Sequence, residues 1–243
     1  MDIICLQETH LSPTTQSRFA HSWGTHRYCS SFSMYTRMTY PCWQSLYANL
    51  PILPPQHVLA DQEGRYIVIM GLFDSTPLTL ITSYTPNVDT PEFFRHIMRQ
   101  MEALPTGTLA WGGDGDHNLV LNPAIDCTQG LDRWSSIASA ALQELMDDNG
   151  LVDIWRVSGP TSAEYTFHSP VHNSSSRLDF WLGSQDVVGW GAAITHLPRS
   201  FSDHPLSYYG CTFHRPAVLC SLGDCNQPNF WAQCSVRRLG KPP

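Results

Sequence analysis

The stretch RYIVIMGLFDSTPLTLITSYT, residues 65–85, places two apolar, β-branched runs on either side of the residues DSTP. Runs of this length and composition are typical of strands buried in a sheet, and Asp, Ser and Pro favour a turn between them. The stretch therefore predicts an antiparallel hairpin in the core of a sheet.

Two helices are predicted next to this sheet. Thr90 and Pro91 supply an N-cap and a first-turn proline, and apolar residues follow at helical spacing, which predicts a helix over 91–104. Residues 135–149 show the same spacing and end at Asn149 and Gly150, a favourable C-terminal cap. Further strands are predicted for residues 2–6 and for the stretches GTLAWGG, LVDIWRV, AEYTF, RLDFWLG and PLSYYGCTF.

Strands paired in hairpins and interrupted by helices indicate an α+β architecture, with two packed sheets and helices outside them. The 243 residues are enough for one sizeable domain. A formal net charge of −7 excludes a polycation that holds nucleic acid by phosphate neutralisation alone, so any such contact is expected to be local. We expect no membrane span, and we expect reduced cysteines in an intracellular protein.

Several polar side chains lie at the ends of the predicted strands, where a rigid sheet presents reactive groups on short loops. They are Glu8 after IICLQ, Asp116 and Asn118 after TLAWGG, Asp179 within RLDFWL, and Asp203 and His204 before PLSYY. Carboxylate oxygens are the ligands that Mg²⁺ or Mn²⁺ prefers. Taken singly, Glu8 reads as an ordinary strand-end carboxylate, Asp179 as a buried partner of Arg177, and His204 as a structural histidine.

The motifs ICLQETH, SYTPN, GDHN, RLDF and SDHP, in this order, resemble those of the endonuclease/exonuclease/phosphatase superfamily. The amino-acid sequence is most similar to the apurinic-type endonuclease domain of LINE-type (non-LTR) retrotransposons, over residues 2–210 except 34–55. This resemblance implies a DNase I-like four-layer α/β/β/α sandwich with an active site at one edge of the two sheets.

The resemblance also implies a role for each motif residue. Glu8 would be the principal metal ligand, with Asp203 at the same or a second metal position. Asp116 would polarise the attacking water, and Asn118 would orient that water or a phosphate oxygen. His204, oriented by Asp179, would meet the scissile phosphate.

Four further residues complete the implied site. Tyr84 would lie near the phosphate, although it also reads as an ordinary strand aromatic, and Asn87 would shape its loop. Thr166 and Arg177 are grouped with the substrate-binding residues, and support of the loop is the favoured role of Arg177.

The implied reaction is Mg²⁺- or Mn²⁺-assisted hydrolysis of a DNA phosphodiester that nicks one strand and leaves a 3′-hydroxyl. The expected partners are DNA and a reverse transcriptase normally encoded in the same polyprotein. The family role further implies a monomer that works in the nucleus.

Three departures from the family pattern matter. The family's first strand, with an asparagine ligand, is expected to be absent, so that residues 1–210 form a truncated domain. The loop WGGDGDHN has two extra residues, which leaves Asp114 as the rival of Asp116. Residues 34–55 and the tail 211–243 are atypical, and the tail is expected to be disordered; its irregular cysteine spacings do not favour a zinc site.

The open alternatives are a superfamily phosphatase or RNA nuclease, and a degenerate remnant without catalytic activity.

Overall fold

The structure of the chain is a computed structural model. It describes residues 3–11, 26–29, 42–48, 57–61, 63–73, 76–104, 108–111, 116–128, 136–159, 161–190, 193–197, 206–212 and 216–222. Within these residues no helix has both the length and the apolar character needed to cross a membrane.

The first sheet has six strands in the order β12-β13-β14-β1-β3-β2. Their bounds are Ala193–Leu197 for β12, Leu206–Thr212 for β13, Pro216–Leu222 for β14, Ile3–Leu11 for β1, Cys42–Ala48 for β3 and His26–Cys29 for β2. β14 pairs with β13 in the antiparallel sense and with β1 in the parallel sense. The C-terminal end of β1 and the N-terminal end of β13 therefore point to the same edge of this sheet.

The second sheet also has six strands, in the order β4-β5-β6-β7-β11-β8. Their bounds are His57–Ala60 for β4, Tyr66–Phe73 for β5, Thr76–Ser83 for β6, Thr108–Trp111 for β7, Leu182–Ser184 for β11 and Leu151–Asp153 for β8. β5 and β6 pair antiparallel from Tyr66 opposite Ser83 to Phe73 opposite Thr76, which confirms the predicted hairpin. A separate small hairpin joins β9 (Phe167–Ser169) to β10 (Ser174–Ser176).

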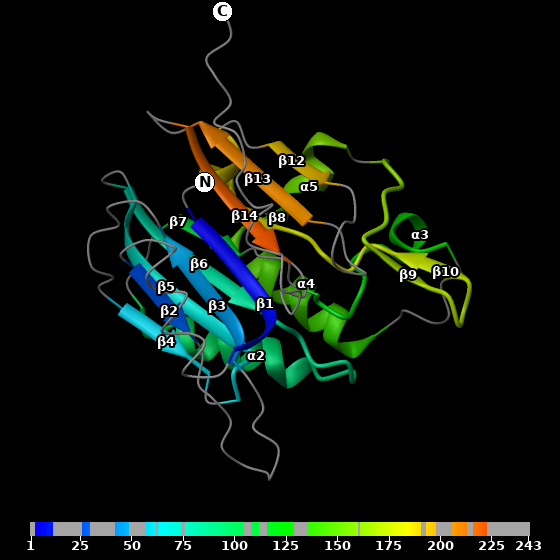
Figure 1. The fold of residues 1–243 in the computed structure, drawn as a ribbon, viewed down its shortest axis with the longest axis horizontal. Helices are drawn as coiled ribbons and strands as arrows, with labels where there is room; N and C mark the ends of the chain where they lie inside the picture. Colours follow the sequence, from blue (N-terminus) through cyan, green and yellow to red (C-terminus); the bar gives the residue numbers. More distant parts are fainter. Residues whose placement is uncertain are drawn as a thin grey trace, which may run out of the picture.

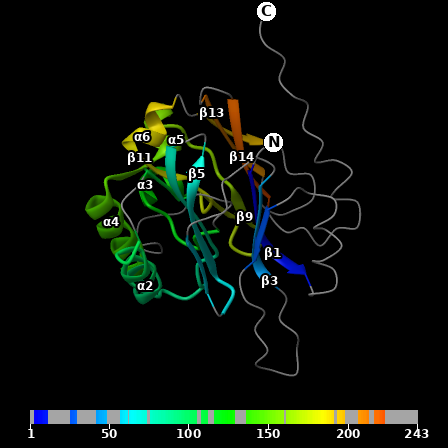
Figure 2. The same ribbon diagram turned by 90° about the vertical axis from the view of Figure 1, so that its left-hand side faces the viewer.

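The two sheets lie face to face, with β3 against β5 and β6. The helices α2 (Pro91–Met101) and α4 (Ile137–Asn149) cover the outer face of the second sheet (Figures 1 and 2). The short helices are α3 (Pro123–Asp126), α5 (Ile154–Ser158) and α6 (Gln185–Gly189). The expectation of helices outside the first sheet falls on residues outside the described part of the chain.

Burial of one face of each long helix holds this side of the sandwich together. Phe94 and Ile97 of α2 and Leu142 of α4 are fully buried and join one core cluster with Ile81 of β6. α2 begins after Thr90, as predicted, and ends three residues earlier than expected. α4 begins at Ile137 rather than 135, because the Ser136 side chain accepts a hydrogen bond from the Ser139 amide at 2.9 Å and acts as the N-cap.

Three predicted strands were too long. In LVDIWRV, the strand stops at Asp153, whose side chain caps α5 by accepting a hydrogen bond from the Arg156 amide. In AEYTF, only Phe167 belongs to a strand, and in RLDFWLG the strand begins at Leu182. The remaining residues of these apolar stretches lie outside strands, and in LVDIWRV they form α5.

The expectation that the tail has no regular element was wrong for residues 216–222. Pro216 stands at the first position of β14, where a strand tolerates proline, and an apolar run follows. The atypical stretch 34–55 likewise contains β3, which pairs with β1. Residues 42–48 and 216–222 are therefore strands of the first sheet.

Candidate active site

Asp116 and Asp179 lie opposite each other in an isolated antiparallel bridge. The next residue extends this pairing, since the amide of His117 donates a hydrogen bond to the carbonyl of Leu178 at 3.0 Å. The structure thus brings together two predicted catalytic residues that are far apart in the sequence. The rival residue Asp114 lies outside the described part of the chain.

Asn118 has a left-handed backbone, with φ of 46°, and its amide donates to Oδ1 of Asp116 at 3.0 Å. Its Nδ2 donates to the carbonyl of Thr85 at 2.8 Å and to Oδ1 of Asn87 at 3.1 Å. Two acceptors fix the orientation of this amide and use both of its hydrogens. Asn118 therefore faces other groups with an acceptor oxygen only, which suits a water molecule and not a phosphate oxygen.

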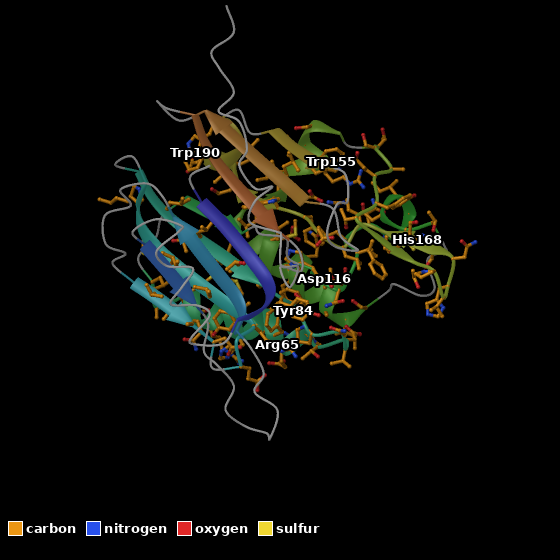
Figure 3. All side chains as sticks on the ribbon, viewed as in Figure 1. Arg65, Tyr84, Asp116, Trp155, His168 and Trp190 are labelled. Carbon is orange, nitrogen blue, oxygen red and sulfur yellow. The ribbon has the colours of Figure 1, made fainter. Side chains whose placement is uncertain are left out.

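Tyr84 follows β6 and is almost buried, with 8% of its surface exposed. Its amide donates to the carbonyl of Arg65 at 2.8 Å, and the guanidinium carbon of Arg65 lies 5.9 Å from the centre of the Tyr84 ring. This separation is within the range of a cation–π contact. The amide of Thr85 in turn donates to the carbonyl of Asp116. Backbone hydrogen bonds of Tyr84 and Thr85 therefore connect the Arg65 end of β5 to Asp116 (Figure 3).

Thr166 does not lie where a substrate contact was predicted. Its side chain is fully buried, and its hydroxyl oxygen accepts hydrogen bonds from the amides of Leu178 at 2.9 Å and Asp179 at 3.1 Å. The prediction of a substrate contact is corrected: Thr166 holds the backbone that carries Asp179.

Arg177 is also wrongly placed among the substrate-binding residues, because only 1% of its surface is exposed. Its carboxylate partners are Asp126, at 2.8 Å from Nε, and Asp153. Asp179 is therefore not the buried partner of Arg177. Asp126 also accepts from Arg156, so the four side chains form one ion-pair network, the buried network below.

The charges in the buried network stabilise one another. Burial opposes the charged form of Asp126, but hydrogen bonds and charge from Arg177, then from Arg156, lower the pKa of this carboxyl. Burial likewise opposes the charge of Arg177, and Asp153 and Asp126 outweigh it and raise the pKa of the guanidinium. Asp126 and Arg177 are thus both ionised at neutral pH.

His117, between Asp116 and Asn118 in the sequence, is fully buried. Its ring stacks on Phe180, with the ring centres 4.0 Å apart and the planes 16° from parallel, and Nε2 lies 3.3 Å from the Phe180 carbonyl. Burial lowers the pKa of His117 to about 4, against the opposing charge of Asp179. The neutral ring of His117 thus packs residues 116–118 against residues 178–180.

Other predicted residues fall wholly or partly outside the description. The backbone of Glu8 belongs to β1, but its side chain lies outside the described part. Asp203 and His204 precede β13 and are also outside it. Among the described residues, no group of three His, Cys, Asp or Glu side chains could hold a metal ion.

No protein-family model matches the chain. Among curated proteins, an uncharacterized 149 kDa protein of transposon TX1 from Xenopus laevis is 24% identical over 227 residues. The match spans 89% of this chain and 16% of the length of that relative.

Solved structures match over most of the chain. The AP endonuclease LMAP from Leishmania major has a TM-score of 0.62 at 18% identity, covering 84% of this chain and 76% of that one. The endonuclease domain of TRAS1, a telomere-specific non-LTR retrotransposon, has a TM-score of 0.58 at 13% identity, covering 88% of this chain and all of that domain. The chain has the endonuclease/exonuclease/phosphatase fold.

Within this fold, the resemblance to LINE-type endonuclease domains is confirmed as a likeness to TRAS1 and to the transposon protein. A 3′ phosphatase from Neisseria, NExo, bound to a product DNA hairpin, also matches, with a TM-score of 0.56 at 20% identity over 87% of this chain and 89% of that one.

Sequence reasoning missed Arg65, His117, Asp126 and Asp153. The two acids could have been noticed in NPAID and LVDIW, where a charge interrupts apolar residues. Arg65 and His117 gave no comparable signal, because their roles arise from contacts across the fold.

Replacing Arg177 by Met is expected to lower the free energy of unfolding by about 3–5 kcal/mol, because Asp126 and Asp153 would lose their buried cation. Urea unfolding followed by circular dichroism measures the change. Arg99→Met, on the exposed side of α2, is the matched control and is expected to change it by less than about 0.5 kcal/mol. Equal effects of the two substitutions would contradict the assignment of a buried network.

The burial of His117 predicts that stability falls in acid. Between pH 6.5 and about 4 the unfolded chain binds a proton at this histidine that the folded chain does not bind, so the free energy of unfolding decreases as the pH falls. The decrease from this residue is expected to reach about 3 kcal/mol at pH 4.

Urea unfolding at several pH values checks this, since His117→Phe should have a shallower dependence on pH in this window. The same measurement on His168→Ala, which removes an exposed histidine, is expected to keep the wild-type slope. If His117→Phe left the dependence of stability on pH unchanged, His117 would bind its proton equally well in the folded and unfolded chains, which would contradict this prediction.

Proposed function

We propose that the chain is a metal-dependent DNA endonuclease domain derived from a non-LTR retrotransposon, which nicks one strand and leaves a 3′-hydroxyl. The observation that carries the proposal is the pairing of Asp116 with Asp179 beside an oriented Asn118. The matched structures support the substrate class, because they include an AP endonuclease, a retrotransposon endonuclease domain and a DNA-bound 3′ phosphatase.

For the metal ion we propose Mg²⁺ or Mn²⁺, with Glu8 and Asp203 as ligands. The donor chemistry near Asp116 fits such an ion, since the carboxylate of Asp116 and the amide oxygen of Asn118 are hard oxygen donors two residues apart in one turn. A bound divalent ion supplies charge neutralisation at the phosphate and at the leaving oxygen.

In this proposal, the chain's own residues position and activate the attacking water. Asp116 accepts a proton from the water, and the amide oxygen of Asn118 accepts its second hydrogen bond, because both Nδ2 hydrogens of Asn118 are used elsewhere. Asp179 orients His204, which meets the scissile phosphate. Tyr84 lies beside the same phosphate, with Asn87 shaping its loop.

Arg65 places a cation beside Tyr84 in a chain whose net charge is −7. The other four arginines whose side chains the structure describes, Arg95, Arg99, Arg156 and Arg177, all pair with carboxylates. The guanidinium of Arg65 lies instead over the Tyr84 ring, where it would meet a phosphate of the DNA backbone.

As partners we propose DNA and a reverse transcriptase of the same polyprotein, which would extend the 3′-hydroxyl in the nucleus. The likeness to NExo favours a second candidate within the fold, a phosphatase that acts on DNA ends. The two activities differ in the product, since a nuclease cuts internal phosphodiesters.

The protein is expected to convert supercoiled plasmid to nicked circles with Mg²⁺ or Mn²⁺ and not with EDTA. Asp116→Asn is expected to lower the rate by about 100-fold or more, because an amide cannot take the proton of the attacking water. Gel densitometry measures the rate, and extension of the nicks by a polymerase without phosphatase treatment shows the 3′-hydroxyl.

Glu144→Gln, an exposed carboxylate on α4, is the control and should keep the wild-type rate. Release of phosphate from 3′-phosphate ends without nicking would favour the phosphatase instead. No cleavage of DNA, RNA or simple phosphoesters would favour a remnant without catalytic activity.

Arg65→Gln is expected to weaken binding of a DNA duplex and to reduce the slope of log Kd against log salt by about one, the loss of one phosphate contact. Fluorescence anisotropy in EDTA measures this without cleavage. Arg95→Gln, an exposed arginine paired with Glu92, should leave the slope unchanged. An unchanged slope in Arg65→Gln would remove this residue from the DNA contact.

A further inference from the structure

The loop over residues 84–90, called the Tyr84 loop below, connects the end of β6 to the start of α2 and carries Tyr84 and Asn87. All seven of its residues lie between two elements of regular structure without pairing in a sheet. What fixes its conformation is therefore a small set of side-chain contacts.

The first half of the Tyr84 loop is hydrogen-bonded to Asp116 and Asn118. The amide of Thr85 donates to the carbonyl of Asp116 at 3.2 Å, and Nδ2 of Asn118 donates to the carbonyl of Thr85 and to Oδ1 of Asn87. The position of Asn87 thus decides whether both Nδ2 hydrogens of Asn118 have acceptors.

The other end of the Tyr84 loop is fastened to α4. The carboxylate of Asp89 accepts from the first amides of this helix, with Oδ2 at 2.9 Å from the Ile137 nitrogen and Oδ1 at 2.7 Å from the Ala138 nitrogen. The hydrogen bonds from Ala138 and then Ile137 lower the pKa of Asp89, so it is charged at neutral pH. A carboxylate at this place also interacts favourably with the positive end of the helix dipole.

α4 is a rigid anchor, because residues such as Leu142 and Leu145 are buried in the core cluster. Asp89 lies only two residues from Asn87, so its attachment to α4 limits how far Asn87 can move from Asn118. The loop is further tightened by the hydroxyl of Thr90, which donates to the carbonyl of Val88 at 2.9 Å.

We propose that Asp89 is a positioning residue for the active site: by binding the N-terminus of α4 it holds Asn87 against Asn118 and so fixes the acceptor oxygen of Asn118. The inference rests on the proposed nuclease function. Asp89 does not touch the substrate, and its effect passes through Asn87 to the oriented amide.

The test compares Asp89→Ala with Gly150→Ala, which perturbs the other end of α4. Gly150 has φ of 60°, and a Cβ there meets no atom within 4 Å, so the alanine variant strains only the helix end. Both variants are expected to lower the melting temperature by about 2–4 °C. Only Asp89→Ala is expected to lower kcat for plasmid nicking, by about tenfold or more with KM changed less than about twofold.

Asp89→Asn serves as the rescue variant, because its side-chain oxygen can still accept one amide of α4, and most of kcat should return. Equal kcat in Asp89→Ala and Gly150→Ala would overturn the proposal. So would a loss of kcat that follows the melting temperature alone.

Hydrogen exchange separates this proposal from the proposed function. If the wild-type protein fails to nick DNA with any metal ion, the nuclease function fails, whereas the anchoring is still measured by mass spectrometry. Asp89→Ala is expected to speed exchange at residues 84–90 and 116–121, and Gly150→Ala is expected not to. Unchanged exchange at 116–121 in Asp89→Ala would overturn the anchoring itself.

Discussion

The backbone pairing of Asp116 with Asp179 is the contact on which the candidate site depends. Neither residue lies in a long strand, so the pairing is not a by-product of an extended ladder. It is held from one side by the buried hydroxyl of Thr166, which binds two amides of the Asp179 segment, and from the other by the stacked rings of His117 and Phe180. The Thr166 hydroxyl and the His117 ring thus fix the positions of residues 178–180, which in a longer strand would be fixed by a ladder of backbone hydrogen bonds.

The buried network anchors the same segment. Arg177 stands two residues before Asp179 and is fastened to Asp126 and Asp153, which belong to α3 and to the start of α5. Isolated buried charges would be unfavourable, but here each charge has a partner of opposite sign within hydrogen-bonding distance. The cost of ionisation inside the protein is therefore offset, and the segment has a defined place relative to two helices.

The sequence predicted the hairpin of β5 and β6 and the helices α2 and α4, because their apolar spacing is regular and their ends carry recognisable caps. It also predicted that Asp116, Asn118 and Asp179 belong to one site, through the order of the motifs. It did not predict that Thr166 and Arg177 are buried, because the burial of a side chain depends on which other elements pack over it. The strand in the tail was missed for a similar reason: its pairing with β13 and with β1, which lies far away in the sequence, makes β14 a strand.

β14 has a consequence for how the chain reaches its native state. It lies between β13 and β1, and its register sets Leu219 opposite Ile3, so nearly the whole polypeptide separates two adjacent backbones. During synthesis, β1 leaves the ribosome long before β14 has been made. Until then one side of β1 presents unpaired amides and carbonyls, a surface on which other strands can aggregate. A chaperone that shields this edge would therefore be needed most before translation passes residue 222.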